Sequence, residues 1–291
     1  MKKILFAVSG LLLLSNSFRA QDDNFDKKFR FGLKVAGQPT WLKSGDNNTK
    51  GNGAGFGFGF GLITEFKLSD IVHFSTGIGG DFETGKIKYR NDYTATNPNN
   101  YYVGYVLDNN SSLVKTENGM QQSSLYSSGN TAFYPITERK IKTTYLTIPL
   151  SLKLLTNEYS GFRYFGMFGG EIGFRLKAKA EDKYLYNINS GSSTVGGSGT
   201  NSNINIGSDA TLIPMRVGMN LGIGTEYRIA GSTSLMLSVN YFHSFTNLMR
   251  NESKYAVTNS SYNATDGTMS FTHLKQNLLA NAIRINVGIM F

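Results

Sequence analysis

The chain has no cysteine and only three histidines in 291 residues, and these shortages exclude several kinds of site. Without cysteine there is no disulfide scaffold, no thiolate zinc site, no thiol nucleophile and no lipid attached to an N-terminal cysteine. Charged residues make up 17 % of the chain, below the usual level of about 25 %. A disordered chain would carry more charge and fewer aromatic residues, so the composition favours a β-protein with one apolar surface.

Long apolar runs are also lacking, because no stretch after the first 20 residues reaches the roughly 18 residues of a transmembrane helix. The first 20 residues differ from the rest. A positively charged start, Met1–Lys3, precedes the apolar run Ile4–Leu14, which is the pattern of a secretory signal peptide. Cleavage is expected after Ala20, with cleavage after Ser17 as the alternative.

Export limits the location and the partners. Residues 21–28 then form a short periplasmic segment, and the protein is expected in the bacterial cell envelope. The net charge of +9 falls to +6 once the signal peptide takes away Lys2, Lys3 and Arg19. This mild excess, together with export, argues against a nucleic-acid partner.

Glycine and aromatic residues are abundant instead, with 33 Gly, 20 Phe and 16 Tyr. They alternate along the chain, as where Phe56, Phe58 and Phe60 are separated by single glycines. A period of two predicts strands with one apolar face. Eight such strands are predicted, at residues 29–37, 55–67, 71–85, 142–154, 162–179, 212–228, 234–246 and 280–291.

The connections between these strands fall into two classes that alternate. Those at 68–70, 155–160 and 229–233 are short, and those at 38–54, 86–141, 180–211 and 247–279 are long and polar. An outer-membrane barrel has this layout, with short periplasmic turns and long outside loops. The sequence therefore predicts an all-β fold over residues 29–291, an eight-stranded antiparallel up-and-down transmembrane β-barrel.

Alternation alone does not say which face points inward, since a soluble lipocalin also has eight strands around a ligand. Aromatic residues at many strand ends and a glycine-rich opposite face with charges of both signs favour the membrane barrel. The chain also ends on an aromatic residue preceded by apolar side chains at alternate positions. This end is the expected signal for the barrel-assembly machinery, and it consists of Ile283, Ile285, Val287, Ile289 and Phe291.

If the apolar face meets lipid, the other face lines the lumen and carries a predicted charge network. An eight-stranded barrel is just wide enough to be filled by side chains. Paired charges are expected to form a structural plug, because an unpaired buried charge is costly; an ion path through the network is the alternative. The network comprises Arg30, Lys34, Glu65, Asp81, Glu83, Lys153, Arg163, Glu171, Arg175, Arg216, Glu226 and Arg284.

The stretch Thr144–Lys153, TYLTIPLSLK, resembles the Tyr-Leu-x-Ile-Pro-Leu-x-x-Lys signature of the PorT-like outer-membrane β-barrel family of Bacteroidetes. The resemblance implies the barrel fold and a non-enzymatic role in the outer membrane, structural or accessory to protein secretion. The namesake of the family is a component of type IX secretion. Secretion-system proteins are therefore among the partners that the resemblance implies.

A lipid-modifying enzyme is a third possibility, and it finds little support in the residues. Catalysis would need a nucleophile beside a base, but neighbours such as His243 and Ser244 point to opposite faces of a strand. Asp81 and Glu83 are two apart and share a face, which suits an acid–base pair or, more often, a pair that answers nearby arginines. No cofactor and no metal are expected.

A surface-binding barrel is the second possibility, because the loop at 86–141 is too long for a passive connector. The loop contains Tyr89, Tyr93, Tyr101, Tyr102, Tyr105, Tyr126 and Tyr134. Tyrosine is common at binding surfaces, so this loop and those at 180–211 and 247–279 could hold a glycan, lipopolysaccharide or a protein. Cations at the rim are expected to meet outer-membrane lipid and lipopolysaccharide phosphates: Lys86, Lys88, Arg90, Arg139, Lys140 and Lys142.

Overall fold

The computed structural model describes residues 27–90, 103–108, 113–115, 121–122, 131–185, 198–207, 211–250, 253–263 and 268–291. The expected signal peptide at 1–20 and most of the segment at 21–28 lie outside these residues. The described part contains no helix that is long and apolar enough to cross a membrane.

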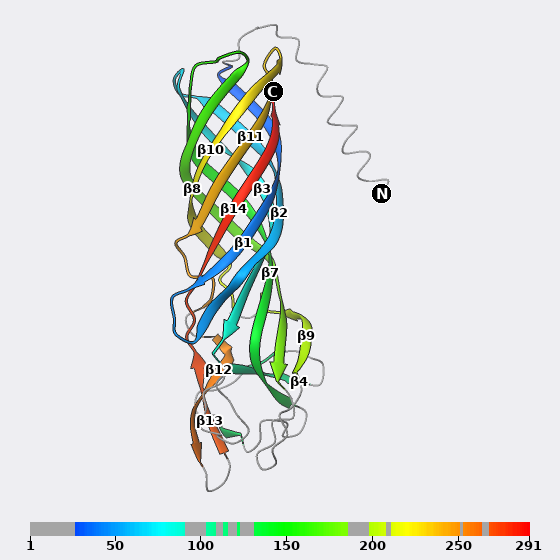
Figure 1. Cartoon of the computed structure of the whole chain (residues 1–291). Helices are drawn as coiled ribbons and strands as arrows, with labels where there is room; N and C mark the ends of the chain where they lie inside the picture. Colours follow the sequence, from blue (N-terminus) through cyan, green and yellow to red (C-terminus); the bar gives the residue numbers. More distant parts are fainter. Residues whose placement is uncertain are drawn as a thin grey trace.

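Eight long strands close an antiparallel barrel, and each pairs with the next in chain order before the last pairs with the first (Figure 1). They are β1 (Phe29–Ser44), β2 (Thr49–Lys67), β3 (Val72–Tyr89), β7 (Thr131–Leu155), β8 (Phe162–Leu185), β10 (Met215–Ala230), β11 (Thr233–Ser244) and β14 (Leu278–Met290). The predicted eight-stranded barrel is therefore confirmed. The first and last strands are joined at their ends, where the main chains of Phe31 and Phe291 exchange hydrogen bonds of 2.7 and 3.3 Å.

The half of the barrel nearest the C-terminus has an apolar outer face and a polar lumen. On β1, Phe31, Leu33 and Val35 point outward and are exposed, whereas Arg30 is fully buried inside. The alternate apolar residues of β14, from Ile283 to Phe291, also point outward. An apolar band thus surrounds a charged interior, which is the arrangement that a bilayer requires of a barrel.

Polarity inverts towards the other end of the barrel, while the strands continue. On β3, Phe82 points outward and Asp81 inward, but a few residues later Lys86 points outward and Ile87 is fully buried. Strands β7 and β8 have 25 and 24 residues, more than twice the roughly 9–11 that cross a bilayer. The wall therefore extends beyond the apolar band and encloses an apolar core. Its members include Leu42, Ile87, Ile136, Ile141, Ile204, Ile206, Phe242, Leu274 and Leu278.

Shorter strands add to this extension at the end opposite the C-terminus (Figure 1). They are β4 (Val103–Asp108), β5 (Leu113–Val114), β6 (Gln121–Gln122), β9 (Ser198–Asn205), β12 (Ser253–Asn263) and β13 (Thr268–Leu274). Strand β4 pairs with the start of β7 and with β12, and β9 pairs with β8. The segments expected to be long loops therefore contain much of the outer β-structure.

The prediction of a long connection at 38–54 is wrong. Strand β1 continues to Ser44 and β2 begins at Thr49, so only four residues turn the chain. The main-chain N–H of Asp46 donates to Ser44 Oγ at 3.2 Å, and that of Asn48 donates to Asp46 Oδ1 at 3.0 Å. The sequence pattern did not indicate a strand here because the outward residues are no longer regularly apolar. The inward residues, such as Thr40 and Leu42, therefore do not differ from them consistently in polarity.

Candidate functional site in the barrel lumen

The lumen near the C-terminal end holds a compact cluster of opposite charges from five strands. Glu226 on β10 accepts a hydrogen bond from Arg30 Nη1 at 2.8 Å and also contacts Lys153 Nζ. Lys153 donates to Glu65 Oε1 at 2.6 Å, and His73 Nδ1 lies 3.7 Å from the same carboxylate. All five side chains are at most 1 % exposed. Two carboxylates thus neutralise two cations inside the wall.

A second cluster fills the lumen at the far edge of the apolar band. Arg216 forms a two-pronged contact with Glu83, with Nη2 to Oε1 at 2.8 Å. Arg284 pairs with Glu171, with Nη2 to Oε1 at 2.9 Å, and lies 3.5 Å from Asp81 Oδ2. Such paired contacts between arginine and carboxylate are strong and fix the geometry of both groups.

Neutral side chains complete this second cluster. Gln38 accepts a hydrogen bond from Arg284 Nε at 2.9 Å, and Thr147 donates to Asp81 at 2.9 Å. The guanidinium of Arg216 lies 3.9 Å from the centroid of the Tyr145 ring and 4.6 Å from that of Phe242. A cation over a ring face is attracted to it, so the two rings help to hold the Arg216 guanidinium in place.

A polar layer without carboxylates separates the two clusters. Asn240 donates to Asn220 Oδ1 at 3.2 Å and accepts from Asn286 Nδ2 at 2.9 Å. The layer encloses a cavity of about 30 Å³ that Lys34 and Ser75 help to line. That volume holds one or two water molecules, so side chains fill almost the whole lumen.

Three of the twelve predicted network residues lie outside the two clusters. Lys34 faces the small cavity between the clusters. Arg163 donates to the main-chain oxygens of Thr156 and Asp70 at the short turns. Arg175 donates to the main-chain oxygens of Ile213 and Leu212, because the alternation of β8 shifts beside it.

The sequence matches the family described as outer membrane protein beta-barrel domain over residues 19–250. The chain belongs to this family. The protein is therefore an integral barrel of the outer membrane, and the apolar band is the part that crosses the bilayer. No curated protein sequence is significantly similar to this outer-membrane barrel.

Solved outer-membrane barrels cover nearly all of this barrel at low identity. OprG from Pseudomonas aeruginosa is 10 % identical, with a TM-score of 0.42 over 93 % of this chain and 99 % of its own. Neisserial surface protein A is 8 % identical, with a TM-score of 0.33 over 91 % and 96 %. Ail of Yersinia pestis, solved with the heparin analogue sucrose octasulfate, is 11 % identical, with a TM-score of 0.30 over 91 % and 100 %.

Outside the bilayer, the outer-membrane barrel buries a further ion pair. Arg139 donates to both oxygens of Asp182 at 2.7 Å and lies beside the rings of Tyr89 and Tyr105. Burial raises the pKa of both tyrosines. Burial also disfavours the charge of Arg139, but Asp182 beside it holds the guanidinium pKa above its usual value.

This buried pair corrects two predictions about the outer loops. Arg139 does not face lipopolysaccharide, because its side chain is 2 % exposed. Tyr89 and Tyr105 belong to the outer core and offer no binding surface. Tyr93, Tyr101, Tyr102 and Tyr126 lie outside the described residues, and so does the side chain of Tyr134 on β7.

His243 and Ser244 have opposite environments, as the alternation predicts. His243 faces outward at the rim, where its Nδ1 lies 2.8 Å from Asn281 Oδ1. Ser244 is fully buried and donates to the main-chain oxygen of Thr246 at 2.9 Å. The two side chains therefore do not form a nucleophile and base. The described residues contain no group of three or more His, Asp or Glu side chains that could hold a metal.

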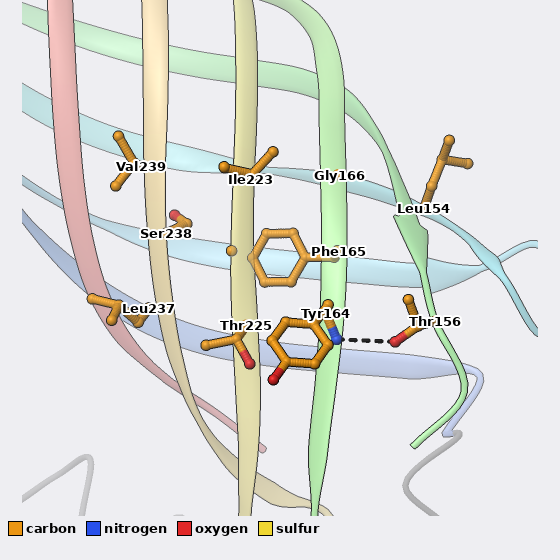
Figure 2. Close-up of a pocket in the computed structure, with 11 residues that line it drawn as sticks. Leu154, Thr156, Tyr164, Phe165, Gly166, Ile223, Thr225, Leu237, Ser238 and Val239 are labelled. Atoms are coloured by element: carbon orange, nitrogen blue, oxygen red, sulfur yellow. Dashed lines mark hydrogen bonds between the residues drawn. The ribbon is translucent and has the colours of Figure 1, made fainter. Parts of the chain in front are cut away.

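The lipid-facing wall is hollowed near its short-turn end (Figure 2). Gly166 on β8 points outward between Leu154 and Ile223, and the open groove there has a volume of about 510 Å³. A neighbouring groove of about 540 Å³ shares these three residues. The walls are almost entirely apolar, so the grooves suit acyl chains of the surrounding lipid.

Several members of the lumen site were not predicted from the sequence: Gln38, His73, Tyr145, Thr147, Ser234 and Phe242. The sequence could have indicated them only by their positions, because they alternate with the outward residues of a predicted strand. Gln38 lacked even this indication, because it fell in the expected loop. Neutral and aromatic residues are common on either face of a barrel, so their phase alone did not single them out.

Proposed function

We propose that this protein is a non-enzymatic outer-membrane component, structural or accessory to type IX protein secretion, and a PorT-like member of its family in Bacteroidetes. One observation carries the structural part of the proposal. The lumen is filled with paired charges in the membrane and with apolar side chains beyond it. A filled barrel gives solutes no passage, whereas its long outer wall offers a platform outside the bilayer.

The role in secretion rests on the resemblance at Thr144–Lys153, and the geometry suits it. Two inward residues of this signature, Tyr145 and Lys153, contact lumen charges, as does Thr147 at a variable position between them. The signature therefore supports a rigid plug. Its partners would be secretion-system proteins at the outer extension, besides outer-membrane lipid and the barrel-assembly machinery during insertion.

Deletion of the gene in the native host tests this role. Type IX cargo is then compared in the medium and in the periplasm, with the wild-type gene restored as the control. Cargo that stays unprocessed in the periplasm is the expected result. Unchanged export would overturn the secretion role and leave a structural or surface-binding barrel.

A further inference from the structure

Strand β9 (Ser198–Asn205) lies at the margin of the outer extension (Figure 1). It is antiparallel to the end of β8, with Ser198 opposite Leu185 and Asn205 opposite Lys179. In the described part of the chain, β9 pairs with β8 alone and is the last strand of the sheet on this side. Its other side is therefore a sheet edge that lies outside the bilayer.

The edge of β9 has little protection against pairing with another strand. Exposed edges usually carry lysine, proline or a bulge, each of which hinders an added strand. The sequence of β9, SGTNSNIN, contains no charged residue and no proline. A bulge bends the half nearer the bilayer, because the register with β8 shifts between Asn201 and Ile204, where Asn203 has a φ of 63°. Residues 198–201 keep a regular register, so this half of the edge is open to a further strand.

The two faces of the open half differ in character. Ser198 and Thr200 are exposed on the outer face. On the inner face, a Cβ atom at Gly199 would lie 2.6 Å from Cζ of Tyr184, and Asn201 Nδ2 donates to the hydroxyl of Tyr105 at 3.0 Å. Side chains alternate between the faces of a strand. A strand added here would therefore have every second side chain in water and the others beside the Tyr184 ring.

The outer face beside β9 carries positive charge. Lys183 of β8 leans away from β9 and contacts Glu138 on β7 at 2.9 Å. Lys179 leans over β9, where its Nζ lies 3.5 Å from Asn203 Oδ1, and it has no carboxylate within ion-pair distance in the described residues. Neighbouring strands are about 4.8 Å apart. The outer side chains of an added strand would therefore come within reach of the Lys179 ammonium.

Charge distinguishes between the extended chains that could occupy this edge. Opposite charges on adjacent strands attract, and like charges repel. The β9 strand of a second copy brings no carboxylate, so pairing between two copies would leave Lys179 without a counter-charge. Lysines also outnumber the carboxylates Glu138 and Glu181 on the outer face of β7 and β8, where they are Lys140, Lys142, Lys177, Lys179 and Lys183. The edge therefore favours a strand with acidic side chains.

We infer that β9 binds an extended segment of a partner protein, which adds to the sheet as a further strand. Carboxylates at alternate positions of this segment face Lys179, and apolar side chains between them face Tyr184. Main-chain hydrogen bonds to residues 198–201 hold the segment, and the alternate side chains give specificity. This inference depends on the outer extension and not on the role in secretion.

The test uses the full-length protein in nanodiscs of neutral phosphatidylcholine. The probe is a fluorescent peptide of alternating valine and glutamate, and its anisotropy measures binding. Two further peptides carry N-methyl groups, one on the valine amides and the other on the glutamate amides. The N–H groups of successive residues in a strand point to opposite edges. One methylated peptide should therefore bind like the parent, and the other about ten-fold or more weakly.

Two variants of the protein place the site. Lys179→Glu reverses the charge beside β9, and Lys50→Glu makes the same change on β2, from which β3, β7 and β8 separate β9. The Lys179 variant should bind the glutamate peptide about five-fold more weakly and should gain binding of a peptide with lysine in place of glutamate. The Lys50 variant should match wild type with both peptides.

Three outcomes would overturn the inference. Equal binding of the two methylated peptides would exclude strand addition, because attraction between charges needs no main-chain contact. Equal losses in the two variants would exclude the position at β9. A dimer in analytical ultracentrifugation that the glutamate peptide dissociates would assign the edge to a second copy. None of these measurements involves secreted cargo, so their result is independent of the role in secretion.

Discussion

At the scale of single residues, Glu226 is the link between two buried cations. It contacts both Arg30 and Lys153, and all three side chains are fully buried. Glu226→Gln removes the charge and leaves the cations to share Glu65. We expect the free energy of unfolding to fall by about 3–5 kcal/mol, the usual cost of breaking a buried pair.

The matched control for this change is Glu158→Gln. Glu158 pairs with Arg228 at a short turn, where both side chains are 31 % exposed. Its loss should cost less than about 1 kcal/mol. Urea unfolding of both variants in the same lipid vesicles makes the comparison, and equal costs would show that the lumen charges do not act as a plug.

Lumen glycines make room for neighbouring strands, and Gly57 shows the tightest kind of contact. A Cβ atom there would lie 2.2 Å from the main-chain oxygen of Phe82 and 3.2 Å from Glu83 Cα. Main-chain atoms in a paired strand cannot move aside, so Gly57→Ala should destabilise the barrel by about 1–3 kcal/mol.

Gly166→Ala is the control for this glycine, because a Cβ at Gly166 has no atom within 4 Å. This substitution adds a methyl group to the outer groove and should leave the barrel as stable as wild type. The folded fraction is measured from the heat-dependent shift of the band in gel electrophoresis. A tolerated Gly57→Ala variant would contradict the close approach of β2 and β3.

At the scale of strands, the outer extension carries a surface ion pair between β7 and β8. A hydrogen bond from Lys183 lowers the pKa of Glu138, with Lys88 adding to the effect. A lowered pKa means that the pair stabilises the folded state above the ordinary carboxyl range and that this stability is lost as the pH falls through the folded pKa.

Glu138→Gln should therefore destabilise the extension by a few tenths of a kcal/mol at neutral pH, because the pair is screened by water. The difference from wild type should shrink as the pH falls below the ordinary carboxyl range and vanish once Glu138 is protonated in the folded state as well as in the unfolded state. Thermal unfolding of the two proteins across this range checks the sign. A difference that grows towards low pH would contradict it.

Most strands of the membrane part could be predicted from the sequence, and their outer ends could not. Alternation of apolar and polar residues marks a strand only where its two faces meet different media. Along β1 the contrast fades after Val35, where Pro39 and Trp41 replace the outward aliphatic residues and Thr40 and Leu42 turn inward. The same inversion hides the start of β7, whose outward residues are charged and whose inward Ile136 and Ile141 are buried.

At the scale of the whole molecule, the sequence could predict that the charged residues of the two clusters point into the lumen. It could not predict which of them pair with each other. Arg216 and Glu83 are 133 residues apart, and Arg30 and Glu226 are 196 apart. Such residues come to the same height in the lumen only when the barrel closes, because closure fixes the offset in register between neighbouring strands. The separation of the charges into two clusters is therefore a property of the closed barrel and not of any strand.

The plug also determines what crosses the membrane through this barrel. Its cavity of about 30 Å³ is too small for a continuous water path, so wild type should show no stable channel in planar bilayers. A variant with alanine in place of both Arg216 and Glu83 loses one charge of each sign, so neither residue leaves the other unpaired. It also loses the two long side chains that fill the lumen next to Phe242. Water then enters, and small fluctuating currents should appear.

The control for the pair is the double alanine variant of Arg228 and Glu158, which lies at a turn outside the plug and should stay silent. Each protein is added to the bilayer at the same folded concentration, and current steps are counted at fixed voltage. Large, stable steps from wild type would show that the charge clusters line an ion path rather than closing it. Silence from the Arg216–Glu83 variant would place the barrier in the remaining layers, where Arg284 and the asparagines are still joined by hydrogen bonds.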